Sequence, residues 1–133
     1  MVDILKEIVK RLPEGKISEA GFEGANIVLY TKDTEFFLDI KGIIRDLVNE
    51  FKKRIELRAD PSVTLDQEKA KKKISELVSA EAGIQEVIFD PQRSRVIIHA
   101  EKPGLAIGKQ GALLRDIRQE TFWVPIIRRM PPI

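Results

Sequence analysis

The amino-acid sequence predicts an α+β protein made of two consecutive copies of one six-element unit. Apolar residues at helical spacing alternate with short β-branched runs, and the same order of elements occurs twice. A Pro-Ser segment at 61–62 separates the copies, so we expect two domains over residues 1–62 and 63–133. Each is expected to run helix, strand, strand, helix, helix, strand.

The elements of the first copy follow from apolar spacing and turn residues. Between Asp3 and Leu12, apolar residues recur at i, i+3, i+4 and i+7, which predicts a helix that ends at Pro13. Glycine and asparagine at 24 and 26 predict a tight turn between two strands. The expected order is a helix over 3–12, strands over 16–22 and 27–30, a short segment over 34–38, a helix over 43–51 and a strand over 54–58.

The second copy repeats this order after residue 62. Thr64 and Gln67 have the spacing of a capping box and predict the start of a helix. Lysines at 69 and 71–73 fall mostly off its apolar face, as expected of a solvated helix surface. The remaining expected elements are strands over 84–89 and 95–100, a turn over 90–94, a helix ending near 122 and a strand over 124–129, closed by Pro131 and Pro132.

The two copies can be aligned residue by residue, which supports an internal repeat. The aligned segments are Ile17–Glu19 with Ile84–Glu86, Ile43–Leu47 with Leu113–Ile117, and Arg58 with Arg129.

Composition excludes several classes of protein. The chain has 133 residues and no cysteine, so it has neither disulfides nor thiolate metal ligands. This fits a reducing compartment, and we expect the cytoplasm. No apolar run reaches the ~18 residues of a membrane span, so no membrane partner is expected. The net charge is −1 over residues 1–62 and +3 over 63–133, which makes the second copy the better candidate for binding a polyanion.

The segment 103–114 carries the strongest functional signal. Gly108 and Gly111 bracket two polar residues, Lys109 and Gln110, immediately before a predicted helix. Glycines allow a sharp turn and close approach to a ligand, and a helix start presents N–H groups that suit a phosphate. The motif alone also fits an ordinary helix–turn–helix corner.

The run from Ile107 to Leu114 resembles the core motif of KH domains, in which an aliphatic residue precedes Gly-x-x-Gly and another follows it. The order of elements resembles the type II KH fold, with helices packed on a three-stranded sheet. The resemblance covers nearly the whole chain as two tandem copies. It implies binding of single-stranded RNA, about four nucleotides per domain.

A closer resemblance is to the N-terminal tandem KH region of archaeal cleavage and polyadenylation specificity factor homologues. It rests on Phe89-Asp90-Pro91, Lys102–Leu105, Trp123-Val124-Pro125 and Arg129–Pro132. That family consists of β-CASP ribonucleases with a metallo-β-lactamase core, which act in RNA 3′-end processing and transcription termination. It implies a downstream nuclease domain as partner, if the chain is a fragment; otherwise the chain is a stand-alone relative. Two alternatives stay open: a NusA-type transcription factor module, and a protein-interaction scaffold that does not bind RNA.

The expected RNA-binding residues lie on and beside the glycine loop. Gly108, Lys109, Gln110 and Gly111 would hold a phosphate. An apolar floor and a basic track would lie next to them, although core packing and solvated charge are alternative roles. The floor candidates are Ile107, Leu105 and Leu114, with Ile97 and Ile98 on a strand, and the basic candidates are Arg115 and Arg118, with Arg93 and Arg95. A double change, Gly108→Asp with Gly111→Asp, is expected to abolish RNA binding and leave the fold intact.

The first copy lacks this loop, and the chain lacks a catalytic constellation. Leu38-Asp39-Ile40-Lys41 stands where the glycine loop should be, so we expect the first copy not to clamp RNA. His99 is the single histidine and falls on a predicted strand, so a structural role is expected, with no metal, cofactor or catalytic residue. Trp123 could stack on a base or anchor an interface.

Overall fold

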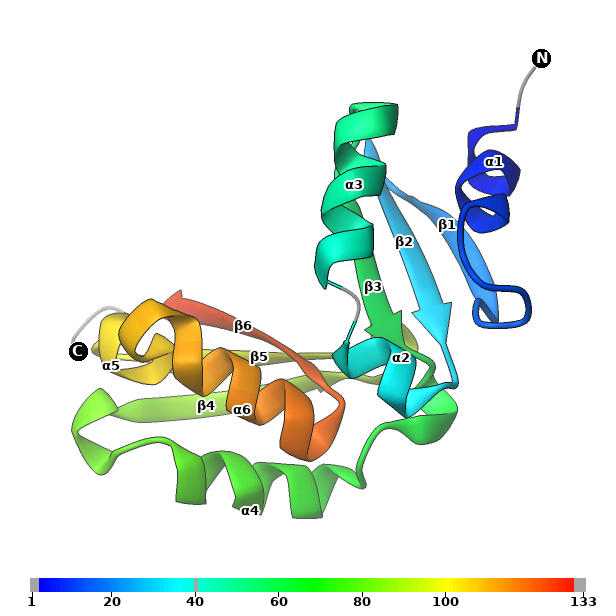
Figure 1. The fold of residues 1–133 in the computed structure, drawn as a ribbon. Coiled ribbons are helices and arrows are strands. Elements are labelled where there is room, and N and C mark those ends of the chain that lie inside the picture. Colours follow the sequence, from blue (N-terminus) through cyan, green and yellow to red (C-terminus); the bar gives the residue numbers. More distant parts are fainter. Residues whose placement is uncertain (1–2, 40, 131–133) are drawn as a thin grey trace. The chain divides into compact units, whose positions relative to one another are not determined.

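Each half of the chain folds around its own three-stranded sheet (Figure 1). The computed structural model describes residues 3–39 and 41–130. The chain divides into two compact units between Val63 and Thr64. None of the helices in these described residues has the length and apolar character needed to cross a membrane.

In the described part of the first unit, three α-helices and a short 3-10 helix accompany the sheet. β1 pairs antiparallel with β2 through a two-residue turn at Gly24 and Ala25, and β2 pairs parallel with β3. Asp33 caps α2, because its carboxylate accepts a hydrogen bond from the Phe36 N–H at 3.0 Å. The elements are α1 (Ile4–Lys10), β1 (Glu19–Glu23), β2 (Asn26–Thr31), α2 (Thr34–Leu38), α3 (Lys41–Phe51), β3 (Ile55–Ala59) and η1 (Pro61–Val63).

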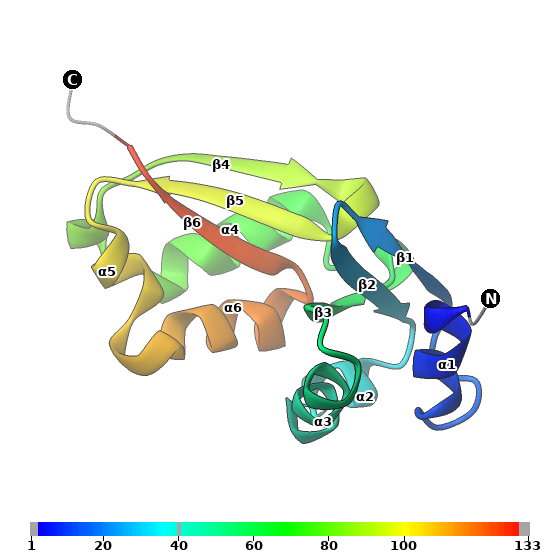
Figure 2. The ribbon, with the colours of Figure 1, turned by 90° about the horizontal axis from the view of Figure 1, so that it is seen from above.

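The second unit repeats this topology. β4 pairs antiparallel with β5, and β5 pairs parallel with β6, so that β5 is the central strand. Figures 1 and 2 show the three α-helices on one side of this sheet. The elements are α4 (Gln67–Leu77), η2 (Ala80–Ala82), β4 (Ile84–Asp90), η3 (Pro91–Arg93), β5 (Arg95–Ala100), α5 (Pro103–Ile107), η4 (Lys109–Gly111), α6 (Ala112–Thr121) and β6 (Val124–Arg129).

The core of the second unit lies between β5 and the helices. Alternate residues of β5, namely Val96, Ile98 and Ala100, are fully buried, as expected for the covered face of a sheet. Ile74 of α4 and Ile117 of α6 pack against them. The face of β5 that carries Ile97 points away from these helices.

The predicted fold is confirmed, with two local corrections. The first strand begins at Glu19 instead of Lys16, and its ladder with β2 starts at the Glu19–Tyr30 pair. The Thr64–Gln67 capping box is wrong: Asp66 caps α4 and accepts from the Lys69 N–H at 3.3 Å. The predicted closure at Pro131 and Pro132 lies outside the described residues.

The sheet register corrects one aligned pair of the repeat. Arg58 pairs with Tyr30, and Arg128 pairs with His99, while Tyr30 and His99 face Glu19 and Glu86 of the matching first strands. Arg58 therefore corresponds to Arg128, one residue before the predicted Arg129.

Arg58 is buried in an ion-pair network inside the first unit. Its side chain is 2% exposed, and its two terminal nitrogens donate to Glu23 at 2.5 and 2.7 Å. Glu56 accepts at 3.0 Å and the Tyr30 hydroxyl at 3.1 Å. Burial by itself lowers the pKa of Arg58, but its hydrogen bonds to Glu23 and Glu56 outweigh burial and raise the pKa above its ordinary value. The guanidinium therefore ties β1 to β3.

Replacing Arg58 should destabilise the first unit. Arg58→Met keeps an unbranched apolar stem but leaves the Glu23 and Glu56 carboxylates without their cation. Because these carboxylates keep part of their exposure to water, we expect a loss of about 2–3 kcal/mol in the free energy of unfolding. Arg128→Met, at the corresponding exposed position, is the control and should change it by less than about 0.5 kcal/mol. Denaturant unfolding followed by circular dichroism measures both, and equal losses would contradict the assignment.

Candidate nucleic-acid interface

The connection between α5 and α6 is a tight corner with a left-handed backbone. Gly108 ends α5 with φ 79° and ψ 171°, Gln110 has φ 56° and Gly111 has φ 75°. Three of the four residues at 108–111 therefore have backbone angles with positive φ, which residues with side chains rarely adopt. The corner redirects the chain between the two helices, and α6 starts directly at Ala112.

Gly108 is required by two independent constraints. Its φ and ψ fall in a region that is essentially restricted to glycine. A Cβ at this position would lie 2.9 Å from the backbone nitrogen of Leu113 and 2.9 Å from its Cγ. Gly111 is required by its backbone angle alone, because an added Cβ would meet nothing closer than Arg115 Nη1 at 3.7 Å.

The corner presents its polar groups to solvent. The side chains of Lys109 and Gln110 are exposed. Within the described part of the chain, no backbone acceptor is found for the N–H of either residue, whereas the Gly111 N–H bonds back to the Gly108 carbonyl at 3.2 Å. Two free N–H groups and a mobile ammonium at the start of a ten-residue helix are suited to a phosphate oxygen.

Arg115 supports this corner from the next helical turn. Its Nη1 donates to the Gln110 carbonyl oxygen at 2.6 Å. This bond fixes the peptide that follows Gln110 and so holds the direction of the loop. Arg115 is still exposed, so its remaining N–H groups stay accessible to a polyanion.

The predicted apolar floor is only partly accessible. Leu105 is 43% exposed, and Ile107 and Leu114 are half-buried around the corner. Ile98 is fully buried in the core and cannot touch a base, and Ile97 lies on the sheet face opposite the helices. The strand over 95–100 is confirmed, but the candidate role of Ile97 and Ile98 as a floor for bases is wrong, and Ile98 has the alternative role of core packing.

The edge strand β6 lies next to the two helices that flank the corner. Both α5 and α6 contact it, and Ile127 pairs with Ile98, which places it on the helix-facing side. Arg129, two residues later on the same side, is exposed. Sequence reasoning missed these two residues because it did not establish that β5 is central and β6 is an edge strand.

The arginines of the β4–β5 turn are already engaged. Arg93 and Arg95 contact the Asp90 carboxylate at 3.2 and 3.4 Å. Burial by itself raises the pKa of Asp90, but these two cations outweigh burial and lower it. Both arginines stabilise the β4–β5 turn through these ion pairs. They are therefore less available to bind RNA phosphates. Arg118 is half-buried on α6.

Trp123 is buried in the core of the second unit, and His99 lies on its central strand β5. Trp123 is 2% exposed, its Nε1 donates to the Leu65 carbonyl at 2.7 Å, and its ring meets Phe89 edge-on at 4.9 Å. Base stacking by Trp123 is therefore wrong. His99 Nδ1 lies 3.5 Å from a Glu86 oxygen on the neighbouring strand. No group of three potential metal ligands occurs among the described residues.

Comparison with known proteins identifies both units. Residues 1–64 match the family model described as "Transcription termination factor FttA, KH domain", and residues 69–122 match the model "KH domain". The chain consists of two tandem KH domains. KH domains are RNA-binding modules without a catalytic role of their own.

The chain is similar over nearly its whole length to archaeal proteins named transcription termination factor FttA. It is 45% identical to the protein of Methanothermobacter thermautotrophicus over 132 residues, 44% to that of Methanosarcina mazei over 134, and 45% to that of Pyrococcus abyssi over 130. These alignments cover 98–100% of this chain but 20–21% of the relatives. The chain thus spans about a fifth of their length. The resemblance to the archaeal cleavage and polyadenylation factor homologues is confirmed.

The first KH domain has a different corner at the corresponding place. Leu38 is the last residue of α2, and Asp39 follows with φ −121°. Leu38, Asp39, Lys41 and Gly42 all lack the positive φ seen at Gly108 and Gly111. Ile40 lies outside the described residues.

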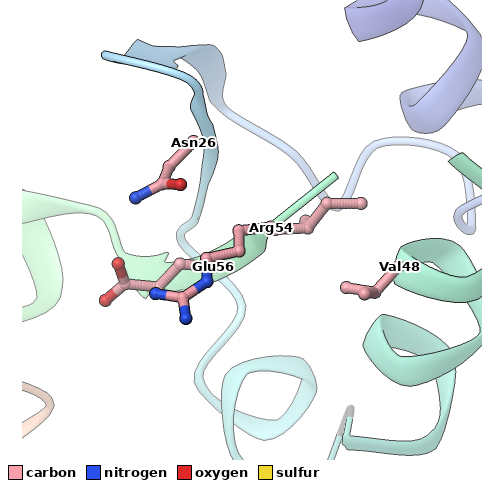
Figure 3. Close-up of a pocket in the computed structure, with 5 residues that line it drawn as sticks. Asn26, Val48, Arg54 and Glu56 are labelled. Carbon is pink, nitrogen blue, oxygen red and sulfur yellow. The ribbon is translucent and has the colours of Figure 1, made fainter. Parts of the chain in front are cut away.

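The first KH domain also has a small surface depression at the opposite end of α3. It has a volume of about 300 Å³. Figure 3 shows Asn26, Arg54 and Glu56 on the strand side and Val48 of α3 across from them. The depression is separate from the α2–α3 corner.

Alanine substitutions should separate the roles of the two loop glycines. Gly108→Ala forces both a glycine-only backbone and a clash with Leu113, so we expect a loss of about 2–3 kcal/mol. Gly111→Ala meets only the left-handed penalty, about 1 kcal/mol. Gly104→Ala is the control, because Gly104 is helical with no atom within 4 Å of an added Cβ, and should be neutral or slightly stabilising. Urea unfolding of the three variants measures these differences in the free energy of unfolding.

A loss for Gly111→Ala as large as for Gly108→Ala would contradict this geometry. The same clash corrects the double aspartate test expected from the sequence, because Gly108→Asp would disturb the packing at Leu113 as well as the binding surface.

Proposed function

We propose that the chain binds single-stranded RNA through the corner at residues 108–111 of its second KH domain. The observation that carries this proposal is the pair of exposed residues, Lys109 and Gln110, held between two glycines in left-handed conformations. This arrangement brings backbone N–H groups within reach of a phosphate without an intervening side chain.

The bound strand would follow the corner and the apolar surface beside it. A phosphate would accept hydrogen bonds from the N–H groups of Lys109 and Gln110, and the ammonium of Lys109 would neutralise it. Unstacked bases would lie against Leu105, Ile107 and Leu114 and be read by their edges. Ile127 and Arg129 of β6 extend this surface, and Arg118 is a further candidate contact.

The biological role we propose is to guide RNA to a downstream β-CASP ribonuclease in RNA 3′-end processing and transcription termination. It is supported by the name of the similar archaeal proteins, transcription termination factor FttA, and by the model of that name over residues 1–64. The same matches favour this role over a NusA-type factor. Because the proposed partner is a nascent transcript, we place this function in the cytoplasm.

The direct test replaces the polar residues and keeps both glycines. Lys109→Asp with Gln110→Asp puts two carboxylates where the phosphate would sit. We expect affinity for a short uridine-rich RNA to fall at least about 30-fold at 50 mM salt, through loss of a charged hydrogen-bonded contact. The thermal midpoint should stay unchanged, because both side chains are exposed. Fluorescence anisotropy measures the affinity.

The control carries the same charge change elsewhere. Asn49→Asp with Lys53→Asp alters two exposed residues of the first KH domain and should leave affinity within about twofold. Titrations at 50 and 200 mM salt should show a shallower salt dependence for the loop variant, by about 0.7 in the logarithmic slope for each lost phosphate contact. Unchanged RNA binding by the loop variant would favour the alternative, a KH scaffold without RNA.

A further inference from the structure

The first KH domain has an open depression between α1 and α3. Its volume is about 580 Å³, within the range of ligand and peptide pockets. Figures 1 and 2 show α1 and α3 on the same side of the sheet of this domain, with α1 beside β1. The depression, called here the α1–α3 pocket, is lined by Arg11, Leu12, Pro13, Ile43, Asp46, Leu47 and Glu50.

In the second KH domain, a longer helix covers the place that corresponds to the α1–α3 pocket. There, α4 has 11 residues and packs along α6, whereas the corresponding α1 has 7 residues and barely touches α3. A helix that is four residues shorter is about 6 Å shorter. The first helix therefore covers less of α3 than α4 covers of α6, and Ile43 of α3 stays 39% exposed.

The floor of the α1–α3 pocket is apolar. Leu12 and Leu47 are 6% and 4% exposed and form its deep surface, while Ile43 is 39% exposed. In the second domain, Ala70 and Ile74 of α4 are fully buried in the core that includes Ile117 of α6. An occupant of the pocket would present such aliphatic side chains to Ile43 and Leu47.

The rim of the α1–α3 pocket carries two carboxylates, and within the described residues only one of them is paired with a cation. Arg11 contacts the Glu50 carboxylate at 3.0 Å and lies over the Phe51 ring at 5.5 Å, so Glu50 is already paired. Asp46 has no ion-pair or hydrogen-bond partner among the residues that the structure describes. In the second domain, Lys73 of the covering helix lies 3.9 Å from Glu120, which corresponds to Glu50. A cation on an occupant of this pocket would instead face Asp46, because Arg11 already takes the place of that lysine at Glu50.

We propose that the α1–α3 pocket is a docking site for a short basic amphipathic helix of a partner protein. The helix would place aliphatic residues on Ile43 and Leu47, and a lysine or arginine three or four positions away against Asp46. An RNA strand is disfavoured there, because the carboxylates of Asp46 and Glu50 would face its phosphates. The first KH domain is then a protein-binding surface next to an RNA-binding sister.

The probe is a synthetic peptide with the sequence of residues 66–78 of this chain, acetylated and amidated at its ends. It has the aliphatic and lysine pattern of the helix that covers α6. Titration into the ¹⁵N-labelled full chain should shift the amide signals of residues 11–13 and 43–50. A peptide with Ile74→Asp should shift these signals at least tenfold less at the same concentration.

Two variants of the chain complete the test. Ile43→Glu should weaken peptide binding at least tenfold, and Asp46→Lys should weaken it at 50 mM salt but much less at 500 mM. Leu38→Glu is the matched control, because Leu38 is 40% exposed and does not line the pocket, and should leave binding unchanged. RNA affinity should be unaffected by all three changes, so failure here is distinguishable from failure of the proposed RNA site.

Several results would overturn the proposal. The first is the absence of shifts at the pocket, or shifts that persist in Ile43→Glu. If sedimentation shows that the chain self-associates and that Ile43→Glu converts it to a monomer, the occupant of the pocket is a second copy of the chain instead. A loss of RNA affinity in Ile43→Glu would assign it to nucleic acid.

Discussion

The packing of Gly108 against Leu113 is the constraint on which the candidate RNA site depends. With no side chain at Gly108, the backbone of α5 comes so close to the start of α6 that an added Cβ would lie 2.9 Å from two Leu113 atoms. This close approach produces the tight corner between α5 and α6. At that corner, the side chains of Lys109 and Gln110 are exposed to solvent. The bond from Arg115 to the Gln110 carbonyl holds the corner in that orientation. A flexible loop would have to be ordered when RNA binds, and a fixed corner avoids much of that entropy cost.

The two KH domains show how one scaffold supports different surfaces. In each, the sheet is covered on one side by helices, and residues at matching positions such as Leu47 and Ile117 are buried. The differences lie in the lengths and in the connections of helices. The second domain has a long first helix and a glycine corner, and the first has a short helix and a corner without positive φ at its described residues. Scaffold burial thus stays constant while exposed connections change, as is usual for sites carried on loops.

Charge is used differently in the two domains as well. Arg58 is buried and its two terminal nitrogens pair with carboxylates of β1 and β3, whereas its counterpart Arg128 is exposed on β6. A buried, paired arginine ties strands together but offers no charge to a ligand. The exposed cations of the second domain remain available to a polyanion. The same residue type at one place in the repeat therefore contributes to structure in one copy and to the surface potential in the other.

The sequence determined the repeat, the order of elements and the glycine corner. These depend on local properties: apolar periodicity predicted the helices and strands, with β5 and β6 placed correctly at both ends, and Gly-x-x-Gly predicted the corner. The sequence could not decide which aliphatic residues stay accessible. Ile97, Ile98 and Ile127 look alike in a strand, and the order of strands in the sheet decides that one faces away, one is sealed in the core and one lies beside the α5–α6 corner. Nor could it assign Trp123 to the core or reveal the α1–α3 pocket. Burial depends on what lies on the other side of a residue, and that neighbour comes from distant parts of the chain.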